Sequence, residues 1–253
     1  MFGQALLRRI PSLVEAQRRL LLGSSGLLLA IAALGRAPLA AQGFPPRPVL
    51  ETLVSTNPNG GAGSGDSTDA AISADGMWIA FQSEATDFVP GDGDRLLDIY
   101  LKDLAKGQMI LVSTNPPIPG AVTKGNGPSA HPSVDAHGEF VVFASTATNL
   151  APDPNGQIPD IFLHEVGTSK NVLISQATRT GADGPSDYPV ISSDGLTIAF
   201  ESQAGNLAAP ATQPGVSRIH VFDVRSGEMI RLEGLRGALA NGGSRRPRLS
   251  SKG

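Results

Sequence analysis

Hydrophobic and polar residues alternate along short segments of this chain, and the segments recur in a fixed order. One unit begins with Asp69–Ser73, which ends at an Asp-Gly turn, and continues with the apolar and β-branched segment Trp78–Ser83. After a loop, Asp98–Leu104 alternates with period two, and a short Gly turn leads into Gln108–Thr114. Period-two alternation bounded by Gly and Asp indicates β-strands. The unit is therefore predicted to be a four-stranded antiparallel meander.

The same pattern returns along the chain, carried by a phrase of the form Ser-x-Asp-Gly followed by apolar residues and Phe. Its turn glycines recur at intervals of 57 to 62 residues: Gly76, Gly138, Gly195 and Gly253. Such self-similarity is the signature of a repeat architecture. The repeat units are predicted at about 69–114, 131–176 and 188–233, with partial units at 49–56 and 247–253. His137 replaces Asp in the second turn and Arg218 replaces Asp in the last third strand, so neither carboxylate is expected to be indispensable.

Repeated four-stranded units that cannot bury both faces alone stack radially as the blades of a β-propeller. The Ser-x-Asp-Gly phrase, followed by Asp-Ile-Phe/Tyr-Leu and a short Gly turn, resembles the TolB-type, WD-repeat-like propeller repeat of bacterial envelope proteins from Leu53 onward. The predicted fold class is all-β: a propeller of four-stranded antiparallel blades, about three of them complete, in an incomplete ring.

Propellers usually close with about four to eight blades. Val49–Thr56 is predicted to be a fourth strand without its own first three, and Leu249–Ser251 a first strand without successors. We expect this chain to be the N-terminal part of a longer propeller. The alternative is that several chains complete one ring, with self-association through open blade edges.

The N-terminal segment has the three parts of a secretory signal. Its positive region contains four arginines: Arg8, Arg9, Arg18 and Arg19. The apolar run Leu20–Leu34 is 15 residues long, shorter than the ~20 needed to span a bilayer, and the small-residue segment Ala37–Gln42 follows. Residues 1–41 are predicted to be a signal peptide, residues 42–253 the repeats, and the protein periplasmic or extracellular. The alternative is an uncleaved membrane anchor.

Composition narrows the possible partners. The 30 glycines, 20 prolines and 5% aromatic residues suit many short strands and turns. The absence of cysteine excludes disulfides, thiolate metal sites and cysteine nucleophiles. Removal of residues 1–41 would change the formal charge from −3 to −7. An acidic surface has no electrostatic footprint for nucleic acid or anionic lipid, so we expect no nucleic-acid partner and no membrane span after signal removal.

Short and long connections alternate in the predicted meanders, which places the long ones at one face of the propeller. The long connections are Glu84–Leu97, Asn115–Ala130, Thr146–Pro159, Ala177–Asp187 and Gln203–Ser217. Because function concentrates on loops held by a rigid scaffold, we expect a functional surface on this face.

Two of these loops are rich in oxygen-bearing side chains. They carry Asp92, Asp94 and Asp98 in the first repeat, and Asp153, Asn155 and Asp160 in the second. Calcium prefers such ligands, but the spacing does not match an EF-hand loop and the third repeat offers only Gln213–Arg218. Asp and Asn also favour turns by bonding to their own backbone. We prefer the turn interpretation and assign no metal ligand and no cofactor.

No catalytic residue is predicted. The histidines differ in strand context and form no His-Glu-x-x-His pattern: His131, His137, His164 and His220. No serine lies in Gly-x-Ser-x-Gly, since Ser64 has Ala62 two positions before it. A pair of acids for glycoside hydrolysis depends on a separation that the sequence does not give. The stripe of Phe81, Phe143 and Phe200 is predicted to be blade-packing core.

Resemblance to TolB-type propellers implies protein–protein contacts, as in the system of TolB and the peptidoglycan-associated lipoprotein. The expected function is an exported, non-enzymatic scaffold whose partner is another envelope protein. The alternative is the propeller portion of a peptidase or of a carbohydrate-active enzyme, since related blades occur in both.

Overall fold

The computed structural model describes residues 52–115, 124–177, 181–232 and 243–253. The predicted signal peptide, residues 1–41, lies outside these ranges. The described ranges contain twelve β-strands and no α-helix, and hence no helix long and apolar enough to span a bilayer.

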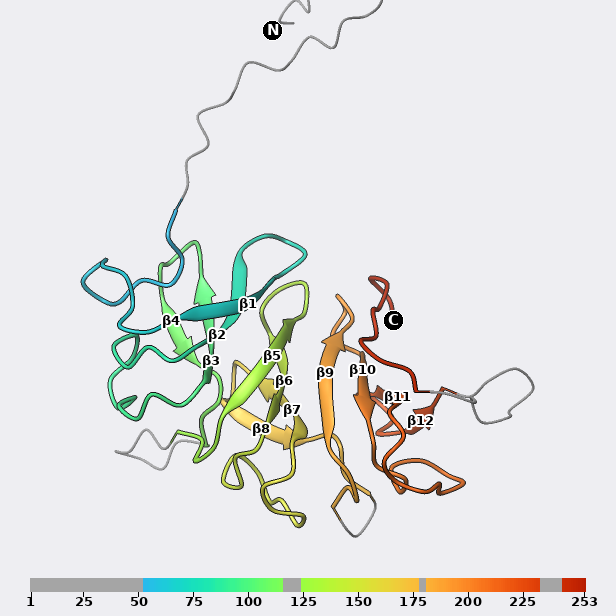
Figure 1. Ribbon diagram of the computed structural model, residues 1–253. Helices are drawn as coiled ribbons and strands as arrows, with labels where there is room; N and C mark the ends of the chain where they lie inside the picture. Colours follow the sequence, from blue (N-terminus) through green and yellow to red (C-terminus); the bar gives the residue numbers. More distant parts are fainter. Residues whose placement is uncertain (1–51, 116–123, 178–180, 233–242) are drawn as a thin grey trace, which may run out of the picture. The chain divides into compact units, whose positions relative to one another are not determined.

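The strands form three four-stranded antiparallel sheets, named blades 1 to 3, which follow one another in chain order (Figure 1). Blade 1 contains β1 (Ser67–Ile72), β2 (Trp78–Ser83), β3 (Asp98–Asp103) and β4 (Met109–Leu111). Blade 2 contains β5 (Ser129–Val134), β6 (Phe140–Ser145), β7 (Asp160–Glu165) and β8 (Lys170–Leu173). Blade 3 contains β9 (Ser186–Ile191), β10 (Thr197–Ser202), β11 (Arg218–Asp223) and β12 (Met229–Arg231). Each sheet is a meander, which confirms the predicted all-β fold of propeller blades.

The upstream partial strand, predicted at Val49–Thr56, lies partly outside the described residues. The segment Val49–Thr56 contains no strand in its described residues, 52–56. It folds like the chain just after β4: the N–H of Thr56 donates to the carbonyl of Val54 at 2.8 Å, as that of Thr114 does to Val112 at 2.8 Å. This bend also ends β4 before the predicted limit of Thr114. A strand requires a hydrogen-bonded neighbour, and among the described residues no third strand pairs with this segment.

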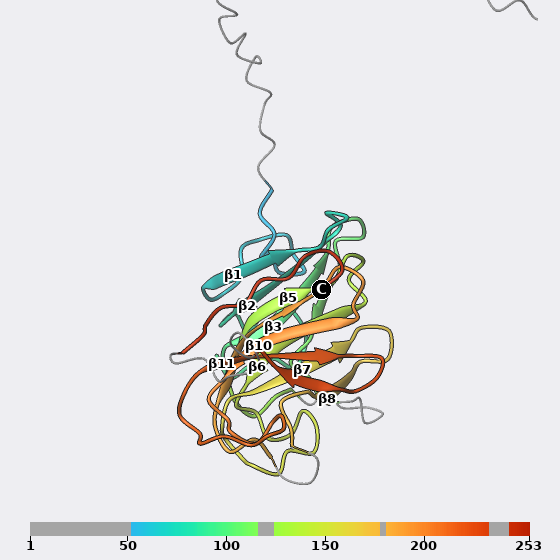
Figure 2. The same cartoon turned by 90° about the vertical axis from the view of Figure 1, so that its right-hand side faces the viewer.

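The downstream partial blade forms its turn without its strand. The predicted strand Leu249–Ser251 is irregular, and the N–H of Gly253 donates to the carbonyl of Ser250 at 3.3 Å. Upstream, the N–H of Ser244 donates to the carbonyl of Ser217 at 2.9 Å, the same inter-blade bond by which β9 begins. Segment 243–253 thus follows the course of a first strand beside blade 3, as Figures 1 and 2 show.

The hydrophobic core lies between successive blades. Because side chains alternate along a strand, Phe143 joins a buried cluster with Ala80 and Leu101 of blade 1, whereas its neighbour Val142 joins one with Ile198 of blade 3. The phenylalanine stripe is buried as predicted, with exposed fractions of 3% for Phe81, 0% for Phe143 and 0% for Phe200.

The turn between the first two strands is fixed by a side-chain network rather than by Asp-Gly alone. In blade 1 the Ser73 hydroxyl donates to Asp75 Oδ1 at 2.6 Å and accepts the N–H of Trp78 at 3.0 Å. The same carboxylate oxygen accepts the N–H of Met77 at 2.9 Å. Blade 3 repeats this network with Ser192, Asp194, Leu196 and Thr197.

The second turn forms without an aspartate at position 137 but has a carboxylate elsewhere in the turn. Asp135 stands where the other copies have serine, and its Oδ1 accepts the N–H of Phe140 at 2.9 Å. Its Oδ2 accepts the N–H of His137 at 3.2 Å. The carboxylate has therefore moved two positions along the turn and still satisfies the turn N–H groups.

The turn glycines are contact points between blades. A Cβ atom built on Gly138 would lie 2.4 Å from the ring of Trp78 in the preceding blade, and one on Gly195 would lie 2.9 Å from the ring of Phe140. Gly76 has the same positive φ, but a Cβ atom there would meet nothing within 4 Å. Glycine is thus required at the later turns by both backbone conformation and space.

Blade 1 has an uncovered face where the later blades are covered. Ile72, the last residue of β1, is 63% exposed, whereas the equivalent Val134 and Ile191 are each 8% exposed. The described residues place no blade against this face, as expected for an incomplete ring.

Replacing Gly138 by alanine should destabilise the protein more than replacing Gly76. Both changes impose the left-handed strain of about 1–2 kcal/mol, but only Gly138→Ala adds the clash with Trp78, worth about 1–3 kcal/mol more. Urea unfolding of the two variants measures the difference. Equal losses would show that this inter-blade contact does not matter.

Candidate binding site on the first strands

The first strand of each blade carries a β-bulge at an equivalent position. The ladder between the first and second strands shifts register there in all three blades. The bulged residue has a positive φ in each copy, and so does its equivalent in segment 243–253: Asp69 (52°), His131 (55°), Tyr188 (50°) and Arg246 (51°). Positive φ is costly for residues other than glycine, and such strain clusters at functional sites.

The scaffold around the bulge repeats while the bulged side chain changes. Two residues before it, a serine hydroxyl hydrogen-bonds a serine of the second strand at 2.9 Å: Ser67 with Ser83, Ser129 with Ser145, and Ser186 with Ser202. The bulged N–H is also held in two copies, where His131 donates to Gln82 Oε1 and Arg246 donates to Glu201 Oε2, both at 3.0 Å. The structure thus presents four different side chains, Asp, His, Tyr and Arg, from one repeated frame.

These four side chains line a single cavity of about 410 Å³ together with their neighbours on β1, β5 and β9 and Arg248. The imidazole of His131 lies with Nδ1 2.6 Å from Asp187 Oδ1 and with Nε2 3.7 Å from Asp69 Oδ2. Its ring centroid is 4.1 Å from that of Tyr188. The guanidinium of Arg246 lies 4.6 Å from the centroid of the Tyr188 ring and donates to its hydroxyl at 3.3 Å.

The surroundings of His131 favour its protonated form. Its hydrogen bond with Asp187 raises its pKa above the ordinary value, and the charges of Asp187 and Asp69 act in the same direction, against burial and Arg246. Nδ1 is hydrogen-bonded to Asp187, whereas Nε2 lies 3.7 Å from Asp69 Oδ2, which is longer than a hydrogen bond. The ring can therefore hydrogen-bond a ligand as well as stack against Tyr188.

A functional surface on the long loops stays a prediction, and of the four cavity residues only His131 was a candidate from the sequence. The cavity lies on the first strands of the blades, because bulges at equivalent positions bring four residues from successive repeats together. The sequence signal for this position is a recurring serine followed, two residues later, by a residue that is different in each copy.

The other histidines lie apart from this cavity. His164 is fully buried with Nδ1 3.0 Å from Asn171 Oδ1, and burial lowers its pKa. His220 is fully buried and stacks on Phe200 with ring centroids 5.7 Å apart. His137 is exposed on its turn, 3.4 Å from Asp75 Oδ2.

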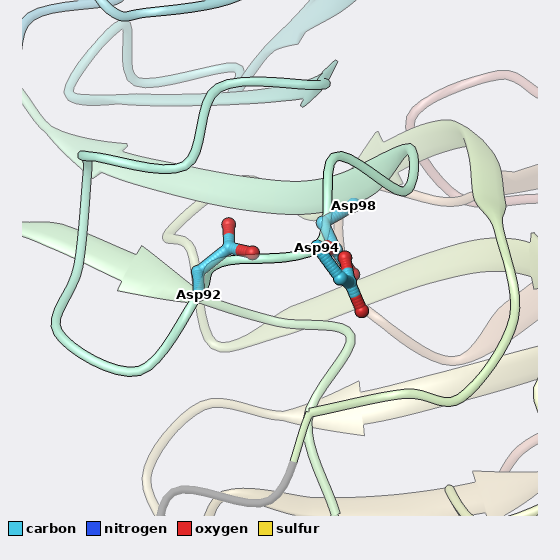
Figure 3. A group of neighbouring side chains, drawn as sticks. All are labelled: Asp92, Asp94 and Asp98. Atoms are coloured by element: carbon cyan, nitrogen blue, oxygen red, sulfur yellow. The ribbon is translucent and has the colours of Figure 1, made fainter.

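The first oxygen-rich loop does bring its carboxylates together. Asp92, Asp94 and Asp98 converge at the start of β3, with ligand atoms within 4.8 Å of one another (Figure 3). The ammonium of Lys124 lies among them, 2.7 Å from Asp92 Oδ1, 2.6 Å from Asp98 Oδ2 and in contact with Asp94. A lysine from the following inter-blade loop therefore supplies the cation that this cluster needs.

Burial and charge act against each other in this cluster. Burial raises the pKa of Asp98 to about 6, despite hydrogen bonds from Lys124 and Ser113 that lower it. Burial alone would lower the pKa of Lys124, but its hydrogen bonds with the three carboxylates raise it well above the ordinary value. The cluster is thus a charge-balanced structural unit in which the ammonium offsets carboxylate burial.

Removing Lys124 should destabilise the fold, and more so at high pH. Lys124→Met leaves the buried carboxylates without their counter-charge. The expected cost is about 3 kcal/mol, near the lower end for buried pairs, because Asp94 is 46% exposed. Since the folded pKa of Asp98 lies above the unfolded value of 3.8, its ionisation already lowers stability as pH rises from about 4 to 6. The variant should therefore lose more stability at pH 8 than at pH 5, measured by urea unfolding.

Lys106→Met is the matched control, since Lys106 is 74% exposed and pairs with Asp103 at 3.4 Å on a turn. It should change stability little at either pH. A pH-independent loss in Lys124→Met would contradict the charge-balance interpretation.

The raised pKa of His131 should depend on Asp187. NMR titration of the imidazole is expected to give a pKa above 6.5 in the wild type and a lower one in Asp187→Asn. Asp69→Asn should lower it less, because that carboxylate lies 3.7 Å away. Because the folded pKa exceeds the unfolded one, the pair stabilises the fold fully below pH 6.5 and loses this contribution as pH rises through the folded pKa. An unchanged titration in Asp187→Asn would refute the pairing.

No family model and no curated protein matches this chain. Solved structures of β-propeller proteins are similar to it. TolB from Acinetobacter baumannii is 20% identical, with a TM-score of 0.40 and coverage of 69% of this chain and 34% of that one. The β-propeller domain of the Trilobed protease from Pyrococcus furiosus is 14% identical, with a TM-score of 0.41 and coverage of 68% and 44%.

Oligogalacturonate lyase from Vibrio parahaemolyticus is 14% identical, with a TM-score of 0.38 and coverage of 64% of this chain and 37% of that one. The matched part of each of these structures is thus 34% to 44% of its own length. The similarity to TolB and other propellers that the repeat phrase implied is found, and it concerns the fold alone.

Proposed function

We propose that this chain is an exported, non-enzymatic propeller scaffold that binds a segment of another envelope protein in the cavity on the first strands of its blades. The observation that carries the proposal is the set of four bulged residues: one repeated frame holds Asp69, His131, Tyr188 and Arg246 around a single cavity. The serine two residues before the bulge recurs in all four copies and proline follows three of the four bulges, while the bulged side chain that lines the cavity is different in each copy.

The side chains favour a protein segment as the ligand. Tyrosine and arginine dominate the energetics of protein interfaces, and the stacked Tyr188–Arg246 pair is already ordered in the cavity. The guanidinium groups of Arg246 and Arg248 and the imidazole ring of His131 can donate to carbonyl or carboxylate oxygens, while Asp69 can accept from N–H groups. A volume of about 410 Å³ accommodates a few residues of a partner.

The proposal of export rests on the N-terminal pattern of arginines, a 15-residue apolar run and small residues. Residues 42–253 have a formal charge of −7. The partner is then a protein of the periplasm or outer surface.

Affinity capture from envelope extract tests the function. The full-length protein is expressed with its own N-terminus and used as bait beside Tyr188→Ala and Arg246→Gln. Wild type should retain a discrete protein, and each cavity variant should weaken its binding about tenfold or more, as expected for an interface hot spot. The captured protein is then purified and its affinity measured by calorimetry.

Lys106→Ala is the control bait, since it removes a 74% exposed charge from a turn on β3–β4. It should bind like the wild type, and circular dichroism should show all baits folded. Retention of a glycan in place of a protein, or binding that both cavity variants leave intact, would overturn the proposal.

A further inference from the structure

The two interfaces between the described blades are built alike. Each contains the second and fourth residues of a third strand, a residue from the segment after the fourth strand, and two residues from the second strand of the next blade. Between blades 1 and 2 these are Ile99, Leu101, Val112, Val141 and Phe143, and between blades 2 and 3 they are Ile161, Leu163, Ile174, Ile198 and Phe200. The repeat therefore shows which side chains fill such an interface.

The uncovered face of blade 1 presents half of a further interface of this kind. Val54 stands at the position of Val112, and Ile79 at that of Val141. Val54 and Ile79 are half-buried, whereas Val112 and Val141 are fully buried. A cavity of about 250 Å³ lies between Val54, Ile79, Phe81 and the start of β1. We call it the acceptor groove; what it lacks among the described residues is the pair of apolar side chains from a third strand.

The polar contacts of a third strand are also defined by the repeat. In blade 1 the hydroxyl of Ser113 donates to Asp98 Oδ1 at 2.7 Å and accepts the N–H of Ile99 at 3.0 Å. The N–H of Val112 donates to the carbonyl of Ile99 at 2.8 Å. Blade 2 repeats these three bonds at 2.5, 2.8 and 2.8 Å, with Ser175, Asp160, Ile161 and Ile174.

Ser55 stands at the position of Ser113 and lines the acceptor groove. Among the described residues, its hydroxyl and the N–H of Val54 have no hydrogen-bond partner. The segment is nevertheless held against blade 1: the N–H of Gly63 donates to the carbonyl of Ser55 at 3.0 Å, and the ammonium of Lys102 donates to the hydroxyl of Thr56 at 3.2 Å. The groove thus combines unpaired polar groups with an apolar floor.

Strand addition uses such an arrangement: main-chain hydrogen bonds supply affinity, and pockets for alternate side chains supply specificity. We propose that the acceptor groove binds an extended segment of a partner protein, of the form Asp-apolar-x-apolar, by strand addition. The aspartate of this segment accepts the Ser55 hydroxyl, and the next residue bonds to Ser55 and to the N–H of Val54. Its two apolar side chains pack against Ile79 and Phe81.

A second copy of this chain does not supply the segment from its described residues. Its third strands, β3, β7 and β11, are each already paired with a strand on both sides. The acceptor groove also differs from the cavity of the bulged residues, which contains neither Ser55 nor Ile79. The proposal therefore does not depend on the function proposed for that cavity.

Fluorescence anisotropy of a labelled peptide on the full chain tests strand addition. The probe has the sequence of residues 95–104, with blocked ends, and the comparison peptide carries Asp98→Ala. Wild type should bind the probe saturably and the comparison peptide about tenfold more weakly, because a hydrogen bond to a charged group is lost. Ser55→Ala should weaken binding of the probe about tenfold and of the comparison peptide little, since both changes remove the same contact.

Ser226→Ala is the matched control, because it removes an exposed hydroxyl from the β11–β12 turn and should bind both peptides like the wild type. If Ser55→Ala does not fold, the two peptides on the wild type decide. Absence of saturable probe binding, equal affinity for the two peptides, or independent losses from Ser55→Ala and the peptide change would overturn the proposal. A wild-type dimer that the probe dissociates in sedimentation would also overturn it, because the groove then holds a second copy.

Discussion

Contact between the turn of one blade and the second strand of the blade before it is the constraint on which the rest of this structure depends. Gly138 and Gly195 lie so close to the rings of Trp78 and Phe140 that a single methyl group would collide. The turn must therefore hold its shape without bulk, which the serine and aspartate side chains achieve by accepting its N–H groups. Blades locked in this way hold their first strands side by side.

Because the first strands lie side by side, their β-bulges together form a candidate binding site. One bulge in one strand would only expose a strained residue, but equivalent bulges in neighbouring strands direct successive side chains into the same cavity. Serine pairs hold the first strand at the bulge in all three blades, and side chains of the preceding blade bind the N–H groups of His131 and Arg246. The frame is thus conserved within the chain, and the bulged residue is free to differ.

The buried aspartate at the start of the third strand also combines a repeated contact with one that differs between blades. Its serine partner recurs in blades 1 and 2, whereas the group facing its second oxygen does not. Lys124 contacts this oxygen in blade 1, whereas a glycine, Gly181, stands at the position of Lys124 in blade 2. Repetition preserves hydrogen bonds made within a blade and relaxes those made by the loops between blades.

The sequence by itself determined the repeat, the strand order and the buried phenylalanine stripe, because these follow from patterns local to about 60 residues. It did not show that Asp135 takes over the turn carboxylate, that the predicted partial strands lack ladder partners, or that Lys124 lies among three aspartates. It also missed the cavity formed by Asp69, His131, Tyr188 and Arg246. Only the tertiary structure decided these points, because each depends on which residues from different repeats are brought together in space.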